Sequence, residues 1–268
     1  MIKLIVSDLD GTLFKNKEGI PRTISPENLQ AIRYWRSKGI VFMCASGRPI
    51  SQRKVMEEEY GFPFDFIGNN GGNMALGDEI VYENLIPQEL FEEFIDFMKV
   101  YQSDCVYSFI FDDYSVMSEY NGLYEKRIGG GPMVKDSTHM SITDYFEQGK
   151  TDLPVRFFIV VDDKHNVIPM MNHLKEHFGD RISVLRSGSN FIEVMNSGVN
   201  KGVGVMVAAQ ILDFTLDEVV TIGDEENDIS MLQLVPHSFA MSQGPDIVKQ
   251  AAHDEVDYVW QITEKLGL

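Results

Sequence analysis

The stretch that constrains this chain most runs from Lys3 to Leu13 and reads KLIVSDLDGTL. Its apolar run is short and continuous, which is typical of a strand buried on both faces of a parallel sheet. The run ends at Asp8 and Asp10, and open parallel sheets bind their ligands beyond the carboxyl ends of the strands. Two carboxylates this close repel each other unless a cation lies between them. The pair therefore predicts a hard metal ion such as Mg²⁺.

The next two residues shape a turn. Gly11 lets the backbone turn sharply, and the hydroxyl of Thr12 is expected to hold that turn. The whole segment DLDGTL resembles the opening motif of the haloacid dehalogenase superfamily of phosphohydrolases. The resemblance implies that the chain is a phosphohydrolase and that the first aspartate of the motif, Asp8, is its nucleophile.

The charge balance limits the partners of this chain. It has 268 residues, of which 23 are basic and 41 acidic, so its net charge is −18. Without a local basic stripe, such a chain is not expected to bind nucleic acid or an anionic membrane surface. The same field repels an anionic substrate. A phosphate site would therefore need a metal ion and local cations.

Cysteine use and the apolar runs predict a cytoplasmic protein without a membrane segment. Cys44 and Cys105 are too few for a disulfide framework, and Cys44 lies in an apolar run that is expected to be buried. The amino-terminal apolar run is interrupted at Asp8, unlike that of a signal peptide. The longest apolar stretch, Val203–Leu212, is too short to span a membrane.

Helix and strand signals alternate in the first part of the chain. Ser25 as N-cap and Pro26 at the first helical position begin a helix. Apolar runs at Ile40–Ala45 and Phe64–Gly68 predict a second and a third buried strand. A strand–helix–strand order is typical of a doubly wound α/β domain, so we predict a Rossmann-like parallel sheet.

From about residue 83 the pattern changes to strand pairs mixed with helices, and Gly129–Pro132 predicts a flexible joint. The first pattern resumes with an expected strand at Asn190–Met195, followed by further strands that include Tyr258–Trp260. This order predicts an α+β cap domain inserted into the α/β core. We expect the core in residues 1–82 and 188–268 and the inserted cap in residues 83–187.

The catalytic candidates are Asp8, Asp10 and Lys201. A carboxylate such as Asp8 can attack a phosphoryl group and hold it as an aspartyl-phosphate, which divides hydrolysis into two easier steps. Asp10 can protonate the leaving oxygen and then take a proton from the attacking water. Lys201 lies at a helix start, where a cation is unfavourable unless an anion is near, so it is expected to point at phosphate and at Asp8.

The metal candidates are carboxylates from both ends of the chain. Asp224 follows a buried strand and is expected to ligate Mg²⁺ beside Asp8, with the backbone carbonyl of Asp10 as a third ligand. Asp228 is expected to support the metal or its waters. Glu225 adds a negative charge near the metal and could alter its affinity.

The substrate-binding candidates belong to both predicted domains. Ser46 is expected to hydrogen-bond a phosphoryl oxygen with help from the backbone N–H of Gly47, and Asn227 is expected to reach the same phosphate. In the predicted cap, Arg127 and His139 lie near the glycine joint and are candidates for selecting the substrate.

Further motifs extend the resemblance. SGRP, NNGG, NKG, GDEENDISML and FAMS resemble the Cof-type branch of the superfamily, and the long insertion resembles its type-2 cap. The branch implies a sugar-phosphate phosphatase. Residue Glu225 departs from the family, which often has a small residue there. The sequence HLKEH at 173–177 also spells a zinc-peptidase motif, but no third ligand accompanies it.

We therefore expect Mg²⁺-dependent hydrolysis of a small phosphorylated metabolite, such as a sugar phosphate, under a cap that excludes water and chooses the substrate. The sequence carries no signal for an oligomeric state. Two alternatives stay open. One is phosphomutase-like transfer to a second hydroxyl, and the other is a non-catalytic Mg²⁺ and phosphate sensor phosphorylated on Asp8.

Overall fold

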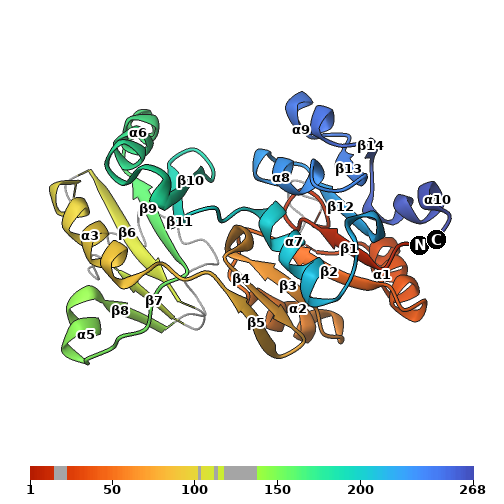
Figure 1. Ribbon diagram of the computed structural model, residues 1–268, viewed down its shortest axis with the longest axis horizontal. Coiled ribbons are helices and arrows are strands. Elements are labelled where there is room, and N and C mark those ends of the chain that lie inside the picture. The colour runs from red at the N-terminus through yellow and green to blue at the C-terminus, as the bar shows by residue number, and fades with distance from the viewer. Residues whose placement is uncertain (15–22, 102–103, 112–113, 118–137) are drawn as a thin grey trace. The chain divides into compact units, whose positions relative to one another are not determined.

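The computed structural model divides into two compact units (Figure 1). It describes residues 1–14, 23–101, 104–111, 114–117 and 138–268. Met1–Tyr82 and Asn200–Leu268 form the first unit, and Glu83–Val199 form the second. The second unit is therefore an insertion into the first, and each is described separately below.

An eight-stranded sheet with the order β14-β13-β12-β1-β2-β3-β4-β5 is the centre of the first unit. The pairs from β14 to β3 are parallel, and β4 pairs with β3 antiparallel. The strands are β1 (Leu4–Ser7), β2 (Val41–Ala45), β3 (Asp65–Gly68), β4 (Asn73–Leu76), β5 (Glu79–Glu83), β12 (Val219–Gly223), β13 (His237–Met241) and β14 (Asp254–Val256). The predicted parallel core sheet is confirmed.

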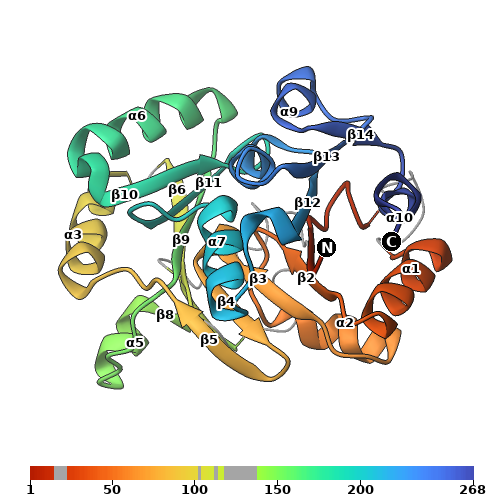
Figure 2. The ribbon, with the colours of Figure 1, turned by 45° about the vertical axis from the view of Figure 1, so that its right-hand side comes forward.

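Helices cover both faces of this sheet (Figure 2). Alternate residues of β1 face opposite layers: Ile5 packs with residues of α1, whereas Leu4 and Val6 pack with residues of α7. The helices are α1 (Pro26–Ser37), α2 (Gln52–Tyr60), α7 (Lys201–Ile211), α8 (Ile229–Leu232), α9 (Asp246–Ala251) and α10 (Ile262–Leu266). The 3₁₀ turns are η1 (Asn69–Gly71), η6 (Leu216–Glu218), η7 (Glu226–Asp228) and η8 (Val259–Gln261).

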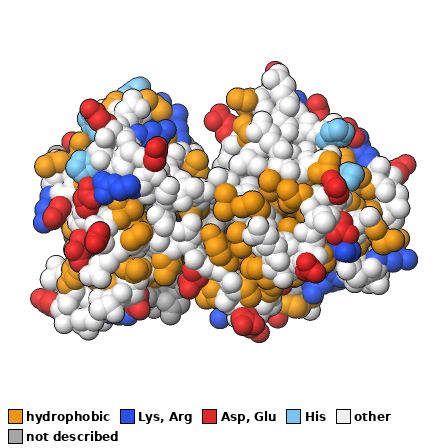
Figure 3. All heavy atoms as spheres, viewed as in Figure 1, with side chains coloured by type: hydrophobic (Ala, Val, Ile, Leu, Met, Phe, Trp, Pro, Cys, Tyr) orange, Lys and Arg blue, Asp and Glu red, His pale blue; other side chains and the backbone are white. Residues whose placement is uncertain are grey.

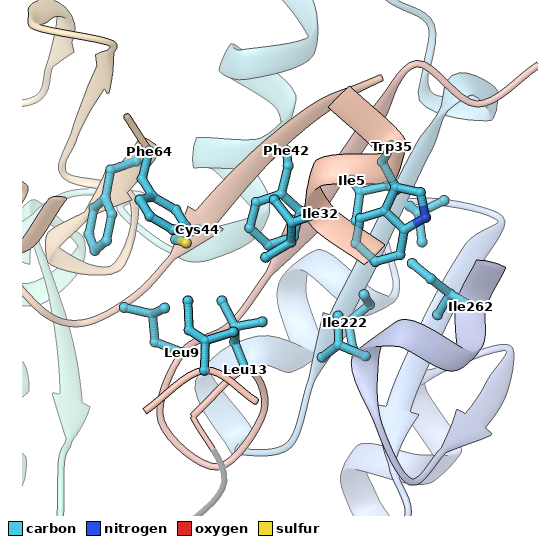
Figure 4. Close-up of a cluster of buried hydrophobic side chains, with 14 of the residues drawn as sticks. Ile5, Leu9, Leu13, Ile32, Trp35, Phe42, Cys44, Phe64, Ile222 and Ile262 are labelled. Atoms are coloured by element: carbon cyan, nitrogen blue, oxygen red, sulfur yellow. The ribbon is translucent and has the colours of Figure 1, made fainter. Parts of the chain in front are cut away.

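Local signals set the start of α1 and the packing of its buried face. The Ser25 hydroxyl accepts a hydrogen bond from the Asn28 N–H at 3.2 Å, as expected of an N-cap. The Trp35 ring stacks on Phe42 with 5.9 Å between centroids, and its N–H donates to Thr263 at 3.0 Å. Figure 4 shows Trp35 among side chains from both ends of the chain. This packing joins the two sequence segments of the first unit.

The second unit contains a six-stranded sheet with the order β10-β11-β9-β6-β7-β8, antiparallel except for the parallel pair β7–β8. Its strands are β6 (Cys105–Ile110), β7 (Tyr114–Met117), β8 (Thr138–Ser141), β9 (Arg156–Val161), β10 (Ile182–Arg186) and β11 (Phe191–Asn196). The helices are α3 (Gln88–Met98), α5 (Ile142–Glu147) and α6 (Val167–Phe178), with 3₁₀ turns η2 (Lys99–Tyr101), η4 (Lys164–Asn166) and η5 (Gly179–Arg181). Residues of all three helices pack in one aromatic-rich core with one face of the sheet.

Two sequence-based predictions about strands are wrong. The strand expected to resume the core at Asn190–Met195 is β11, which pairs with β9 and β10 of the second unit, so the core does not resume at residue 188. Apolar and polar residues alternate along β11, with Ile192 and Val194 in the aromatic-rich core and Glu193 on the other face. Such alternation is typical of an antiparallel strand that packs on the core with one face. Tyr258–Trp260 does not form a strand; Val259–Gln261 is the turn η8, after β14.

Acidic side chains are spread over both units in the view of Figure 3, and hydrophobic atoms gather over the region of α7. Met206 and Ile211 of this helix are exposed apolar side chains. None of the described helices is long and apolar enough to cross a membrane. The expected joint at Gly129–Pro132 lies outside the described residues.

We predict that Trp35→Ala lowers the free energy of unfolding by about 3–5 kcal/mol, because it removes a fully buried indole from the core. Chemical denaturation monitored by circular dichroism measures this loss. The neighbouring Tyr34, which is 38% exposed, supplies the control, and Tyr34→Ala should cost less than about 1 kcal/mol. Equal losses in the two variants would contradict this account of the core.

Candidate active site

Four neighbouring strands bring the candidate residues of the first unit to one edge of the sheet. The strands β12, β1, β2 and β3 are adjacent and parallel, so their carboxyl ends lie together. The candidates that follow them are Asp8 and Asp10 after β1, Ser46 and Gly47 after β2, and Asp224, Asn227 and Asp228 after β12. Lys201 is the first residue of α7.

Lys201 joins two carboxylates in the buried centre of this edge. Its Nζ lies 2.6 Å from Asp8 Oδ1 and 2.6 Å from Asp228 Oδ1. Burial alone would lower the pKa of the Lys201 ammonium, but the carboxylates of Asp228 and Asp8 outweigh it and raise that pKa. The lysine is therefore a fixed positive charge. Its position against Asp8 is the one that the sequence predicted.

The start of α7 explains why this lysine is held so closely. The Asn200 side chain caps the helix by accepting a hydrogen bond from the Val203 N–H at 3.0 Å. The N–H of Gly202 donates to the Ser230 hydroxyl at 3.0 Å, and an added Cβ at Gly202 would lie 2.5 Å from the Ser230 carbonyl oxygen. Only glycine permits this approach of α7 to α8, and the sequence analysis did not identify Ser230.

Three buried carboxylates surround this single ammonium. Asp8, Asp224 and Asp228 each offer an oxygen within 4.8 Å of the others. Burial raises the pKa of Asp8 well above its usual range, and the nearby Asp228 and Asp224 add to the effect while Lys201 opposes it. Burial also raises the pKa of Asp224 to about 6. The cluster therefore has more negative charge than Lys201 can balance, and its hard oxygen donors fit Mg²⁺.

Within this cluster, both carboxylate oxygens of Asp228 already accept hydrogen bonds from the protein. Its Oδ1 accepts from Lys201, and its Oδ2 accepts from the backbone N–H groups of Asp224 and Glu225 at 2.9 and 3.0 Å. Both oxygens are engaged, so Asp8 and Asp224 are better placed to contact a metal directly. The Glu225 side chain is exposed, and its charge contributes to the raised pKa of Asp224.

The turn after β1 also acts on Asp224. Thr12, expected to hold its own turn, instead donates its hydroxyl hydrogen to Asp224 Oδ1 across the site at 2.5 Å. Gly11 has a φ of 97°, and an added Cβ would lie 2.1 Å from Asp224 Oδ2. Glycine is therefore required here for backbone conformation and for space. Together these residues fix the orientation of the Asp224 carboxylate.

Arg48, part of the motif SGRP, was given no role from the sequence but holds the predicted acid–base residue. Its Nε and Nη2 each lie 2.7 Å from one oxygen of Asp10, which is a bidentate pair. Its Nη1 also donates to Gln52 at 3.0 Å. Nothing in the spacing of Asp10 and Arg48 along the chain could show this contact, which depends on adjacent parallel strands.

Ser46 lies in the same network and is 3% exposed. Its hydroxyl accepts from the Arg48 N–H at 3.2 Å, and its carbonyl oxygen accepts from the Asn70 N–H at 2.9 Å. The Asn227 side chain donates to Asn70 Oδ1 at 3.0 Å. Ser46, Gly47 and Asn227 are thus brought to one part of the site, as a phosphate-binding role requires.

The remaining candidates belong to the second unit. Arg127 lies outside the described residues, and His139 is in β8, where its backbone is opposite Ser115. His173 is hydrogen-bonded to Tyr101 at 3.1 Å, and His177 to Glu93 at 3.0 Å. Among the described residues, the cluster of Asp8, Asp224 and Asp228 is the one group of three suitable metal ligands.

We predict that the metal-free protein loses stability as the pH rises from about 4 to about 6. The raised pKa of Asp224, about 6 against the usual 3.8, means that the folded chain keeps a proton which the unfolded chain releases. The contribution of this proton to the stability of the folded chain is complete below pH 3.8 and is lost as the pH rises through about 6. In EDTA, the melting temperature should fall less steeply with rising pH for Asp224→Asn than for the native chain.

Added Mg²⁺ should raise the melting temperature of the native chain by several degrees above pH 6 and by less at pH 5, where protons compete for the carboxylates. Asp224→Asn should weaken this response. Identical pH profiles in EDTA and identical responses to Mg²⁺ for both proteins would contradict the assignment of Asp224.

Comparisons with known proteins agree with this geometry. Residues 5–261 match the family of haloacid dehalogenase-like hydrolases. YwtE of Bacillus subtilis, a 5-amino-6-(5-phospho-D-ribitylamino)uracil phosphatase, is 25% identical to this chain, and the match covers 93% of this chain and 91% of YwtE. A putative phosphatase of Haemophilus influenzae is 26% identical over 94% of this chain and 92% of its own.

Solved structures share the fold. A haloacid dehalogenase-like hydrolase from Bacteroides thetaiotaomicron matches with a TM-score of 0.82 and 25% identity over 99% of this chain and 100% of its own. A sugar phosphatase of subclass IIB matches with a TM-score of 0.79 and 20% identity over 99% of both chains. The predicted family and enzyme class are confirmed: the chain belongs to the haloacid dehalogenase-like hydrolases, as a phosphatase of that family.

Proposed function

We propose that this protein hydrolyses a small phosphomonoester of the sugar-phosphate class, with Mg²⁺, through an aspartyl-phosphate on Asp8. One observation carries the proposal. Asp8 is held at 2.6 Å by a buried lysine inside a cluster of three carboxylates that needs a further cation. Such an arrangement suits a carboxylate nucleophile that must approach an anionic phosphoryl group.

In the first step, an oxygen of Asp8 attacks phosphorus and the bond from phosphorus to the ester oxygen breaks. Among the described residues, only Lys201 hydrogen-bonds to the Asp8 carboxylate, and it does so through Oδ1, so Oδ2 is the oxygen that we assign as nucleophile. Asp10 gives a proton to the leaving ester oxygen. Lys201 stabilises the negative charge on the transferring group.

In the second step, water attacks the same phosphorus atom and gives its proton to Asp10. The bond from phosphorus to Asp8 then breaks, which releases inorganic phosphate, restores the Asp8 carboxylate and leaves Asp10 protonated for the next turnover. Asp8 and Asp224, with the backbone carbonyl of Asp10, would hold Mg²⁺. When bound, Mg²⁺ would neutralise phosphoryl oxygens and reduce the repulsion between the reacting carboxylates.

The pair of Arg48 with Asp10 sets a condition on both steps. Because Arg48 engages both oxygens of Asp10, at least one of these contacts must open before Asp10 can transfer a proton to the leaving oxygen. We propose that Arg48 orients Asp10 between turnovers and that binding of the substrate releases one oxygen.

The substrate class rests on the relatives. Three Bacillus subtilis relatives, each 25–26% identical to this chain, are named 5-amino-6-(5-phospho-D-ribitylamino)uracil phosphatases, whose substrate has a phosphate on a sugar-derived chain. A structural neighbour is a sugar phosphatase. These names support a small phosphorylated metabolite as substrate. Selection of the substrate by the inserted unit, including Arg127 and His139, belongs to the same proposal.

We predict that the native protein releases phosphate from p-nitrophenyl phosphate with Mg²⁺ and not with EDTA. Asp8→Asn should abolish turnover, because an amide oxygen is a poor nucleophile. Asp246, whose side chain is 92% exposed, offers a control, and Asp246→Asn should keep native activity. Metal-independent turnover, or turnover by Asp8→Asn, would contradict the mechanism. Transfer to an added sugar hydroxyl in place of water would indicate a phosphomutase-like enzyme.

A second prediction concerns Arg48. Lysine cannot make the bidentate contact, so Arg48→Lys should leave Asp10 poorly oriented and lower kcat by about tenfold to a hundredfold. The half-saturating Mg²⁺ concentration should change little, since Asp224 is untouched. Steady-state kinetics with p-nitrophenyl phosphate measure both quantities. A native kcat for Arg48→Lys would show that the pair with Asp10 has no role in turnover.

A further inference from the structure

The turn after β3 contains two consecutive asparagines in the left-handed region of backbone conformation. Asn69 has a φ of 49° and Asn70 a φ of 57°. Both are buried, with exposures of 0% and 2%. Asparagine tolerates this conformation better than most residues other than glycine, but it remains uncommon. Two such residues together in a buried turn therefore indicate a role for their side chains.

The side chain of Asn70 links two loops of the candidate site. Its Oδ1 accepts from Asn227 Nδ2 at 3.0 Å, and its backbone N–H donates to the Ser46 carbonyl oxygen at 2.9 Å. A Cβ added to Gly47 would lie 3.3 Å from Asn70 Nδ2, so Asn70 also packs against the backbone of that glycine.

The topology shows what this link spans. In the strand order β12-β1-β2-β3, Asn227 follows the first of these strands, Ser46 the third and Asn70 the fourth. The remaining strand, β1, ends at Ser7, and Asp8 follows it directly. The link therefore joins the loops on either side of the proposed nucleophile, and both loops hold groups that we assign to phosphate binding.

We propose that Asn70 is a positioning residue for the phosphate of the substrate, an inference that rests on the proposed function. Its oxygen takes one of the two N–H groups of the Asn227 amide and so turns the other toward the site. Its backbone fixes the Ser46–Gly47 turn. Asn70 thereby aligns donors from two loops on one phosphoryl group without contributing a charge.

Asn69 supplies a matched control one residue away. It is also buried and left-handed, but its side chain donates to Asn73 at 3.0 Å and not to either phosphate loop. Its backbone N–H donates to the Arg48 carbonyl oxygen at 2.9 Å, which a substitution by glycine preserves. Asn69→Gly and Asn70→Gly therefore remove similar side chains from similar backbone conformations.

The test compares Asn70→Gly with Asn69→Gly in the full-length protein. The quantities are KM and kcat for p-nitrophenyl phosphate, the inhibition constant of inorganic phosphate, the half-saturating Mg²⁺ concentration and the melting temperature. Asn70→Gly should raise KM and the phosphate inhibition constant by about tenfold while Mg²⁺ dependence stays native. Asn69→Gly should change the phosphate inhibition constant by less than about twofold.

A double variant shows whether Asn70 acts through Asn227. If it does, Asn70→Gly combined with Asn227→Ala should bind phosphate little more weakly than Asn227→Ala alone. Equal rises in the phosphate inhibition constant for Asn69→Gly and Asn70→Gly, or a native value for Asn70→Gly, would overturn the inference. The proposed function is tested separately, on the native protein. If the native protein shows no Mg²⁺-dependent turnover, the proposed function fails, whatever the variants of Asn70 do.

Discussion

The ammonium of Lys201, buried between Asp8 and Asp228, is the interaction on which the site depends. The lysine and Asp8 are 193 residues apart in sequence but 2.6 Å apart in space. Burying charges is costly unless they are paired and hydrogen-bonded, and here the pairing stays incomplete because Asp224 adds a third carboxylate. The first unit therefore places an unbalanced negative charge at the sheet edge, which favours a divalent cation.

This local arrangement also resolves a conflict in the whole chain. A protein with a net charge of −18 repels phosphorylated substrates at long range. At the site, Lys201 and Arg48 are both engaged with carboxylates, so neither by itself makes the edge positive. A bound cation would add the missing charge. The attraction of the site for phosphate thus depends on the bound metal ion.

The sequence predicted the contact of Lys201 with Asp8, but it missed the contacts of residues that no short pattern marks. Asp8, Lys201 and Asp224 could be found because strand ends and helix starts are visible as short patterns. The contact of Arg48 with Asp10 and that of Thr12 with Asp224 arise only when parallel strands align. The prediction that β11 belongs to the core sheet is wrong because an apolar run does not show which strands it pairs with.

The aspartyl-phosphate on Asp8 is the central claim, and a rapid-quench experiment tests it most directly. The native protein is mixed with Mg²⁺ and excess p-nitrophenyl phosphate, stopped in acid within the first turnovers and digested for mass spectrometry. We predict that the peptide containing Asp8 gains the mass of one phosphoryl group and loses it again once substrate is exhausted. Turnover with no phosphorylated peptide, or with the group on another residue, would contradict the account.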